Sequence, residues 1–146
     1  MHEFSFQNKT AVITGGARGI GRCIAEEFVR HGAQVHVIDI APGEHYVGDI
    51  SDPAVLEAFV KEITRGGARI DYLINNALPE MHGIDDCSWE QFNYALQVGV
   101  AAPFYLTKLL PVVSIQPGEM ELTRTRPARL TASAWVSAAM PPLAAV

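Results

Sequence analysis

A group of glycines near the amino end is the feature of this chain that most directly suggests chemistry. An apolar stretch at residues 9–14 leads into a turn that contains Gly15, Gly19 and Gly21, and a helical pattern follows at once. Glycines let a backbone turn sharply and approach a phosphate closely. The first turn of the next helix offers N–H groups and the positive end of its dipole to an anion. The sequence therefore predicts a pyrophosphate-binding turn.

The elements around this turn have the strand–helix–strand pattern that such a site requires. Ile24, Phe28 and Val29 fall at helical spacing within residues 22–31, and Gly32 ends the pattern. Residues 34–39 form a second apolar strand, which ends in Asp39. Asp39 follows the turn by about 20 residues, where a ribose-binding carboxylate is expected. The alternatives are a glycine turn without a ligand and an aspartate at a solvated strand end.

The residues after the turn exclude a Walker-type phosphate loop. Gly16 and Gly21 have the glycine spacing of that motif, but Arg22 and Cys23 stand where it needs Lys and Ser or Thr. The lysine that holds the phosphates and the hydroxyl that holds Mg²⁺ are therefore both missing.

Composition restricts the class of protein. The chain has 146 residues, of which 49% are hydrophobic and 18% charged, as expected for one α/β domain with a sizeable core. A net charge of −5 without a basic run argues against nucleic-acid binding, and no apolar run is long enough to cross a membrane. The five histidines and two cysteines lack metal-ligand spacing. Isolated cysteines and an amino end unlike a signal peptide predict a cytoplasmic location.

Strands and helices continue to alternate after Asp39. The predicted elements are a short strand at 46–47, a helix from Pro53 to before Gly66, a core strand at 70–74, a helix at 88–96 and a long apolar helix from 98 to about 113. The helix that begins at Pro53 is expected to have Ser51 or Asp52 as its cap and an apolar face made of Leu56, Phe59, Val60 and Ile63. Pro103 is expected in the first turn of the long helix, and Pro111 is expected to end it early. This alternation predicts a Rossmann-type doubly wound parallel sheet of about four strands.

The composition changes at residue 114. Residues 114–146 contain four prolines and seven alanines but no Lys, Asp, Tyr or Phe. We therefore predict a nucleotide-binding domain at residues 1–113 and an atypical, poorly ordered tail at 114–146.

Four motifs in this order resemble the short-chain dehydrogenase/reductase family over about residues 4–113. They are the turn Thr14–Gly21, which looks like Thr-Gly-x-x-x-Gly-x-Gly; Asp39, like the adenosine-ribose carboxylate; Asp49 in Gly48-Asp49-Ile50, like the acid beside adenine; and Asn75-Asn76-Ala77, like Asn-Asn-Ala-Gly with Leu78 at the glycine position. The resemblance implies a cofactor site made of Gly15, Arg18, Gly19, Ile20, Gly21, Asp39, Asp49, Ile50, Asn75, Asn76 and Ala77.

The resemblance also implies a cofactor, a substrate class and a partner. Asp39 favours NAD, because a carboxylate accepts a hydrogen bond from the ribose 2′-OH and repels a 2′-phosphate. Arg18 favours NADP, but we give Asp39 the greater weight. The substrate would be a small alcohol or carbonyl compound. In the family the long helix packs against its copy, so residues 98–113 could form a homo-oligomer contact.

The family's catalytic residues have no counterpart here. Its chemistry uses a Ser, a Tyr with a Lys four residues later, and an Asn on the long helix. The Asn position aligns with Gly99, while Tyr105 and Lys108 are the last tyrosine and lysine and lie in the predicted long helix. Ser133 and Ser137 alone cannot replace the set.

Three hypotheses about function follow. The chain is an NAD(H)-linked oxidoreductase by descent, a catalytically inactive dinucleotide-binding or interaction module, or a truncated or frameshifted fragment. A changed reading frame, splice or annotation near codon 114 would explain the tail. Resequencing tests this hypothesis, which fails if no alternative frame encodes Tyr-x-x-x-Lys.

Overall fold

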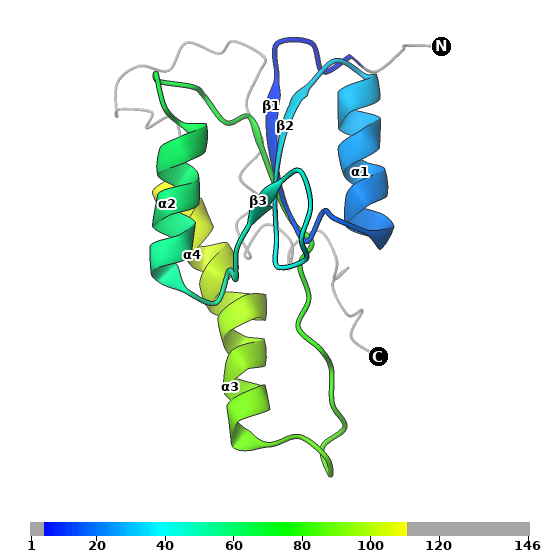
Figure 1. Cartoon of the computed structure of the whole chain (residues 1–146), viewed down its shortest axis with the longest axis vertical. Helices are drawn as coiled ribbons and strands as arrows, with labels where there is room; N and C mark the ends of the chain where they lie inside the picture. Colours follow the sequence, from blue (N-terminus) through cyan, green and yellow to red (C-terminus); the bar gives the residue numbers. More distant parts are fainter. Residues whose placement is uncertain (1–4, 111–146) are drawn as a thin grey trace, which may run out of the picture. The chain divides into compact units, whose positions relative to one another are not determined.

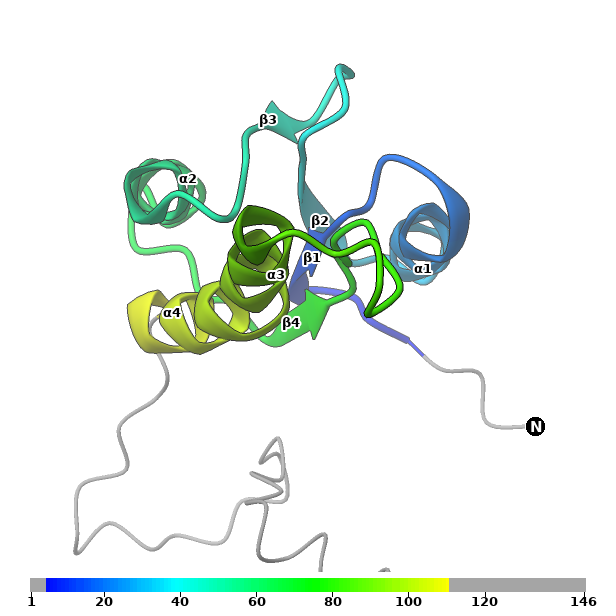
Figure 2. The same cartoon turned by 90° about the horizontal axis from the view of Figure 1, so that it is seen from below.

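The computed structural model describes residues 5–110, which form a parallel sheet with helices on both faces (Figure 1). Its four strands are β1 (Thr10–Thr14), β2 (Gln34–Asp39), β3 (Tyr46–Val47) and β4 (Tyr72–Asn75), in the order β3-β2-β1-β4. Helix α1 (Gly19–Arg30) covers one face, and α2 (Pro53–Ile63) and α4 (Ala102–Leu109) cover the other (Figure 2). This confirms the predicted doubly wound α/β fold. The predicted tail lies outside the described residues.

Strand β1 is the centre of the sheet. Its residues Ala11, Val12 and Ile13 are 0% exposed and pair with β2 on one side and β4 on the other. An uninterrupted apolar run suits this place, because a parallel strand covered by helices on both faces has no solvent-facing side. The carboxyl ends of all the strands point the same way, so the turns that follow them meet at one edge.

The main core lies between the sheet and helices α2 and α4. The predicted apolar face of α2 is confirmed, since its members are all buried: Leu56, Phe59, Val60 and Ile63. Of the two predicted caps for α2, Asp52 is the one used, because its side chain accepts a hydrogen bond from Ala54 N at 2.8 Å. Pro53 then occupies the first helical position, where its missing N–H does no harm.

Aromatic rings fill the space beneath α1. The centroid of the Phe6 ring lies 4.6 Å from that of Phe28 and 5.5 Å from that of Tyr72. Ile24 on α1 is half-buried, as the helical spacing predicted. Val29 was predicted on the same face but is 58% exposed. The contact made by α1 is therefore narrower than its apolar pattern indicated.

The two helices predicted after residue 88 are one continuous helical run, so the predicted break near residue 97 is wrong. Helix α3 (Trp89–Leu96) continues through a π-helical segment, η1 (Gln97–Ala101), directly into α4. Pro103 lies in the first turn of α4, as predicted, but the helical run reaches it without a break from η1. A proline lacks the N–H donor and crowds the carbonyl of the preceding turn. The wider π turn just before it, in which Ala102 N donates to Gln97 O, accommodates that loss.

The ends of two further elements differ from prediction. Strand β4 begins at Tyr72 and not at residue 70, and Asn75 is its last residue. Helix α4 ends at Leu109, and Leu110 is extended with φ −69° and ψ 132°. This early end agrees with the predicted effect of Pro111, because the residue before a proline is driven out of the helical region.

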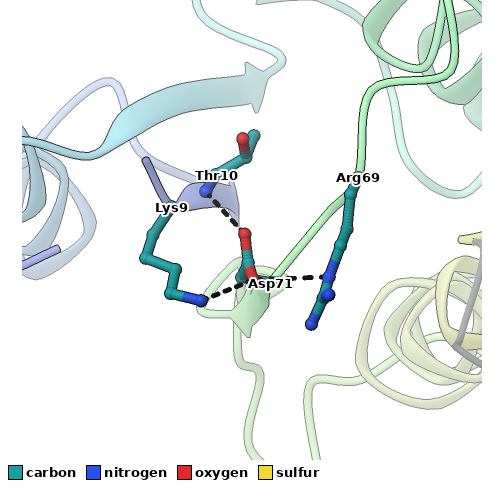
Figure 3. Close-up of polar contacts among 4 residues, drawn as sticks. All are labelled: Lys9, Thr10, Arg69 and Asp71. Carbon is teal, nitrogen blue, oxygen red and sulfur yellow. Dashed lines mark hydrogen bonds and ion pairs between the residues drawn. The ribbon is translucent and has the colours of Figure 1, made fainter. Parts of the chain in front are cut away.

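An acidic side chain ties the amino ends of β1 and β4 together (Figure 3). Asp71, whose side chain is only 10% exposed, accepts a hydrogen bond from Thr10 N at 3.1 Å. It also pairs with Lys9 Nζ at 3.2 Å and Arg69 Nε at 3.5 Å. This contact fixes the register of the two strands at the edge opposite the glycine turn.

Within residues 5–110, no helix is long and apolar enough to cross a membrane. No group of three or more His, Cys, Asp or Glu side chains gathers there as metal binding would require.

Candidate functional site

The predicted site residues lie mainly at the carboxyl ends of the strands. The glycine turn follows β1, Asp39 ends β2, and Asn75 ends β4, next to β1. Ligands of open α/β sheets bind outside this edge. The fold therefore gathers motifs that are more than 50 residues apart in the sequence into one region.

The amino end of α1 faces this edge without a cap of its own. Arg18 at the cap position is extended, makes no capping hydrogen bond, and no acidic residue lies in the first turn. Helices α2 and α3 differ, because Asp52 caps α2 and Ser88 forms a capping box at α3. The first N–H groups of α1 and its positive dipole end are thus available to an anion.

Two glycines shape the turn for different reasons. Gly19 has φ +57°, and a Cβ built there would meet no heavy atom of the described chain within 4 Å. The left-handed backbone favours glycine, and the space beside it is open. A Cβ at Gly21 would lie 2.3 Å from Gly15 O and 2.4 Å from Asn76 Nδ2, so α1 can pack on the turn only without a side chain there.

Asn76 and Thr14 join the turn to the end of β4. Asn76 Nδ2 donates to Thr14 O at 3.1 Å and to Gly15 O at 2.8 Å. Thr14 Oγ1 accepts hydrogen bonds from the backbone N of Asn76 and of Ala77, both at 3.1 Å. Thr14 was not predicted as a site residue, although a lone hydroxyl at the end of an apolar strand was a usable signal.

Asp39 reaches from β2 to the glycine turn. Its Oδ2 accepts a hydrogen bond from Ala17 N at 2.9 Å, and its Oδ1 accepts one from Ala41 N at 2.9 Å. A carboxylate has about four acceptor positions, so both oxygens retain capacity for a further donor. The half-buried Asp39 thus holds the turn in place and can still accept a hydrogen bond from a sugar hydroxyl.

Asp49 and Ile50 follow β3 and have different surroundings. Asp49 Oδ1 accepts a hydrogen bond from Ser51 N at 2.9 Å, and the Tyr94 hydroxyl lies 3.3 Å from each Asp49 oxygen. Burial, together with the charge of Asp49, raises the pKa of Tyr94. Ile50 belongs to the buried core. Only its backbone can face a ligand.

The other predicted site residues are exposed around the turn. Arg18 and Ile20 flank Gly19, and Ile20 is 75% exposed. Asn75 borders an open depression of about 450 Å³ whose other lining residues are Pro103, Phe104, Thr107 and Lys108 on α4.

Gly99, Tyr105 and Lys108 do not come together in one place. Gly99 lies in η1 and is exposed. The Tyr105 hydroxyl donates to Glu57 on α2, and Lys108 is exposed on α4. Tyr105 and Lys108 therefore do not form an acid–base pair at the glycine turn.

Comparisons with known proteins agree with this geometry. The family model described as short chain dehydrogenase matches residues 9–118. The chain is 33% identical over 116 residues to oxidoreductase UcpA of Escherichia coli (strain K12), covering 68% of this chain and 44% of that protein. It is 32% identical over 124 residues to sorbitol dehydrogenase of Cereibacter sphaeroides, covering 75% and 48%.

A solved structure is also similar. An apo SCOR enzyme from Clostridium thermocellum matches with a TM-score of 0.65 and 35% identity, over 70% of this chain and 48% of that one. The chain thus spans about half the length of each of these relatives.

Proposed function

The chain belongs to the short-chain dehydrogenase family, and on this basis we propose that it binds NAD(H) at the glycine turn. The pyrophosphate would lie at the amino end of α1, over Gly19, and the adenosine ribose at Asp39. Asn76 and Thr14 would act by holding the turn. When bound, NAD accepts and NADH supplies a hydride at a substrate carbon.

The observation that carries this proposal is the pairing of Asp39 with the turn. The carboxylate accepts a hydrogen bond from Ala17 N at 2.9 Å beside a helix end without a cap, and it keeps acceptor capacity. A ribose 2′-hydroxyl would donate a further hydrogen bond to the Asp39 carboxylate. A 2′-phosphate would instead be repelled by its negative charge. This supports NAD over NADP, and we give it greater weight than the exposed Arg18.

Replacing the carboxylate tests the choice of cofactor. Asp39→Ala should weaken NADH binding by roughly tenfold or more, because it removes a hydrogen bond to a charged group. The same change should strengthen NADPH binding relative to NADH, since the repulsion is gone. Fluorescence titration of both cofactors measures this. Unchanged affinities for both would remove Asp39 from the site.

For the reaction, we propose that enzymes of the type to which this chain belongs act on a hydroxyl or carbonyl compound. One relative named above is a sorbitol dehydrogenase, which supports the class. The 146-residue chain as given should nonetheless show no turnover. None of its four tyrosines has a lysine four residues later, so the alkoxide lacks its proton donor.

A panel of alcohols with NAD, and of ketones with NADH, tests this second proposal. Absorbance of NADH should stay constant with every substrate although the cofactor binds. Measurable oxidation of any alcohol, lost in Gly19→Asp, would contradict it. The chain would then be an enzyme and not a catalytically inactive dinucleotide-binding module.

We also propose that the helical run α3–η1–α4 mediates self-association. It carries a row of exposed apolar side chains: Trp89, Phe92, Leu96, Val100 and Phe104. Phe104→Ser should shift the sedimentation coefficient toward the monomer, whereas Ile84→Ser, at an even more exposed apolar position on the preceding loop, should not. A monomeric unsubstituted chain would overturn the proposal.

A further inference from the structure

Tyr94 contacts one of the proposed nucleotide-binding carboxylates from a distant part of the chain. Its hydroxyl oxygen lies 3.3 Å from Asp49 Oδ1 and 3.3 Å from Asp49 Oδ2. Tyr94 lies on α3, whereas Asp49 follows β3, so the contact links two elements that are not neighbours in sequence. No motif in the sequence singles out Tyr94.

The two oxygens of Asp49 have unequal surroundings. Oδ1 accepts a hydrogen bond from Ser51 N at 2.9 Å in addition to the Tyr94 hydroxyl. Among residues 5–110, the Tyr94 hydroxyl is the one hydrogen-bond partner of Oδ2. The backbone N–H of Ser51 and the hydroxyl of Tyr94 thus hold the Asp49 carboxylate in its orientation. Oδ2 retains acceptor positions for a donor from a ligand.

Tyr94 is itself held in place and keeps its proton. Its ring packs against the buried core cluster. Burial raises the pKa of Tyr94, and the Asp49 charge and hydrogen bond raise it further. The Tyr94 hydroxyl therefore keeps its proton at neutral pH and acts as the donor in this contact.

The position of Asp49 after β3 would place it beside the base of a bound dinucleotide. In the sheet, β1 carries the glycine turn, β2 ends in Asp39, and β3 lies next outward with Asp49 after its end. A nucleotide with its pyrophosphate at the turn and its ribose at Asp39 would place its base toward β3. The group it meets there is a carboxylate, which only accepts hydrogen bonds.

We propose that Tyr94 is a positioning residue that orients Asp49 to select a base with an exocyclic amino group. The inference rests on the proposed NAD(H) site. An amino group donates to Oδ2, whereas a carbonyl in the same place would set its lone pairs against the carboxylate. Adenine carries the amino group and hypoxanthine the carbonyl, so the two bases differ at the atom that Asp49 would read.

Titration of the full chain with NADH and with reduced nicotinamide hypoxanthine dinucleotide tests the proposal. The unsubstituted chain should prefer NADH by roughly tenfold. Tyr94→Phe should reduce that preference by about two- to tenfold while the protein stays folded. Tyr105→Phe is the matched control, because it removes a hydroxyl that donates to Glu57 on the same helical run, away from the site. It should leave the preference unchanged.

A double-mutant cycle separates positioning from a general structural effect. Asp49→Ala should lower the preference, and Tyr94→Phe in that background should change it no further. Equal losses of affinity for both dinucleotides in Tyr94→Phe, or an unsubstituted chain without a preference, would overturn the role of Tyr94 and leave the NAD(H) site standing. No NADH binding by the unsubstituted chain would overturn both.

Discussion

Each end of strand β1 is held to a residue beside β4 by a hydrogen bond between a side chain and the backbone. The two ends differ in the hydrogen-bonding groups and charges that they leave available to a ligand. At the amino end, Asp71 accepts from the backbone of Thr10 at 3.1 Å. At the carboxyl end, Asn76 donates to the backbone of Thr14 at 3.1 Å. Asp71 and Asn76 flank β4, and each bonds the β1 backbone across more than 60 residues of sequence.

The partners around these contacts differ. The Asp71 carboxylate has two cations beside it, Lys9 and Arg69, so its charge is matched within the fold. At the other end the α1 helix begins without a cap, and Asp39 keeps acceptor positions beyond its two backbone partners. A saturated end serves stability. An end with spare donors and acceptors is where a polar ligand can bind.

Breaking the saturated end should give the largest effect on stability. Asp71→Ala should lower the free energy of unfolding by about 2–3 kcal/mol, because it removes a mostly buried charged acceptor and leaves Thr10 N without it. The affinity of the folded protein for NADH should not change. Chemical denaturation and a cofactor titration check the two parts. A large loss of NADH affinity in folded Asp71→Ala would remove the distinction between the two ends.

A pair of glycines sharpens the comparison at the open end. Gly19 and Gly66 both have positive φ, +57° and +79°, and at neither would a Cβ meet a described atom within 4 Å. Changing either to Ala should therefore destabilise the protein by a similar amount, about 1–2 kcal/mol. Only Gly19→Ala should also weaken NADH binding, since Gly66 follows α2 away from the turn. Equal effects on binding would mean that Gly19 contributes only its backbone conformation.

The smallest expected effect concerns pH and lies within the sheet. His36 on β2 is half-buried, its Nε2 is buried without a hydrogen-bond partner in the described residues, and burial lowers its pKa. The unfolded chain then binds more protons than the folded one, so stability should fall as pH drops below the ordinary histidine pKa. His36→Gln should flatten the dependence of Tm on pH between about 7.5 and 5.5. If His36→Gln leaves the dependence of Tm on pH unchanged, other titratable groups cause that dependence.

Local patterns predicted the parts of the fold that depend on neighbours in the sequence. The buried face of α2, its aspartate cap and the strand–turn–helix around Gly19 all follow from spacing within a few residues. The continuity of α3 and α4 did not, because the π turn that accommodates Pro103 has no signal in residue type. The pattern of α1 also placed Val29 inward, where the sheet does not reach it.

The candidate site divides in the same way. Its glycines and Asp39 could be predicted because turn chemistry and strand ends are local features. The strand-end hydroxyl of Thr14 was also a local signal, but its partners 62 residues away could not be predicted. The role of Tyr94 had no such signal, and its partner is 45 residues away. Such contacts depend on strand order and helix placement, which a single sequence does not specify directly.

The most direct test of the central claim is a titration of the 146-residue chain with NADH. Binding is monitored by the blue shift and the increase of NADH fluorescence. We predict saturable binding at one site per chain, tighter for NADH than for NADPH. Gly19→Asp should abolish it, because the new carboxylate would fill the space before α1 with negative charge, while thermal unfolding stays cooperative. Absence of saturation by the folded, unsubstituted chain would contradict the account, as would undiminished binding in Gly19→Asp.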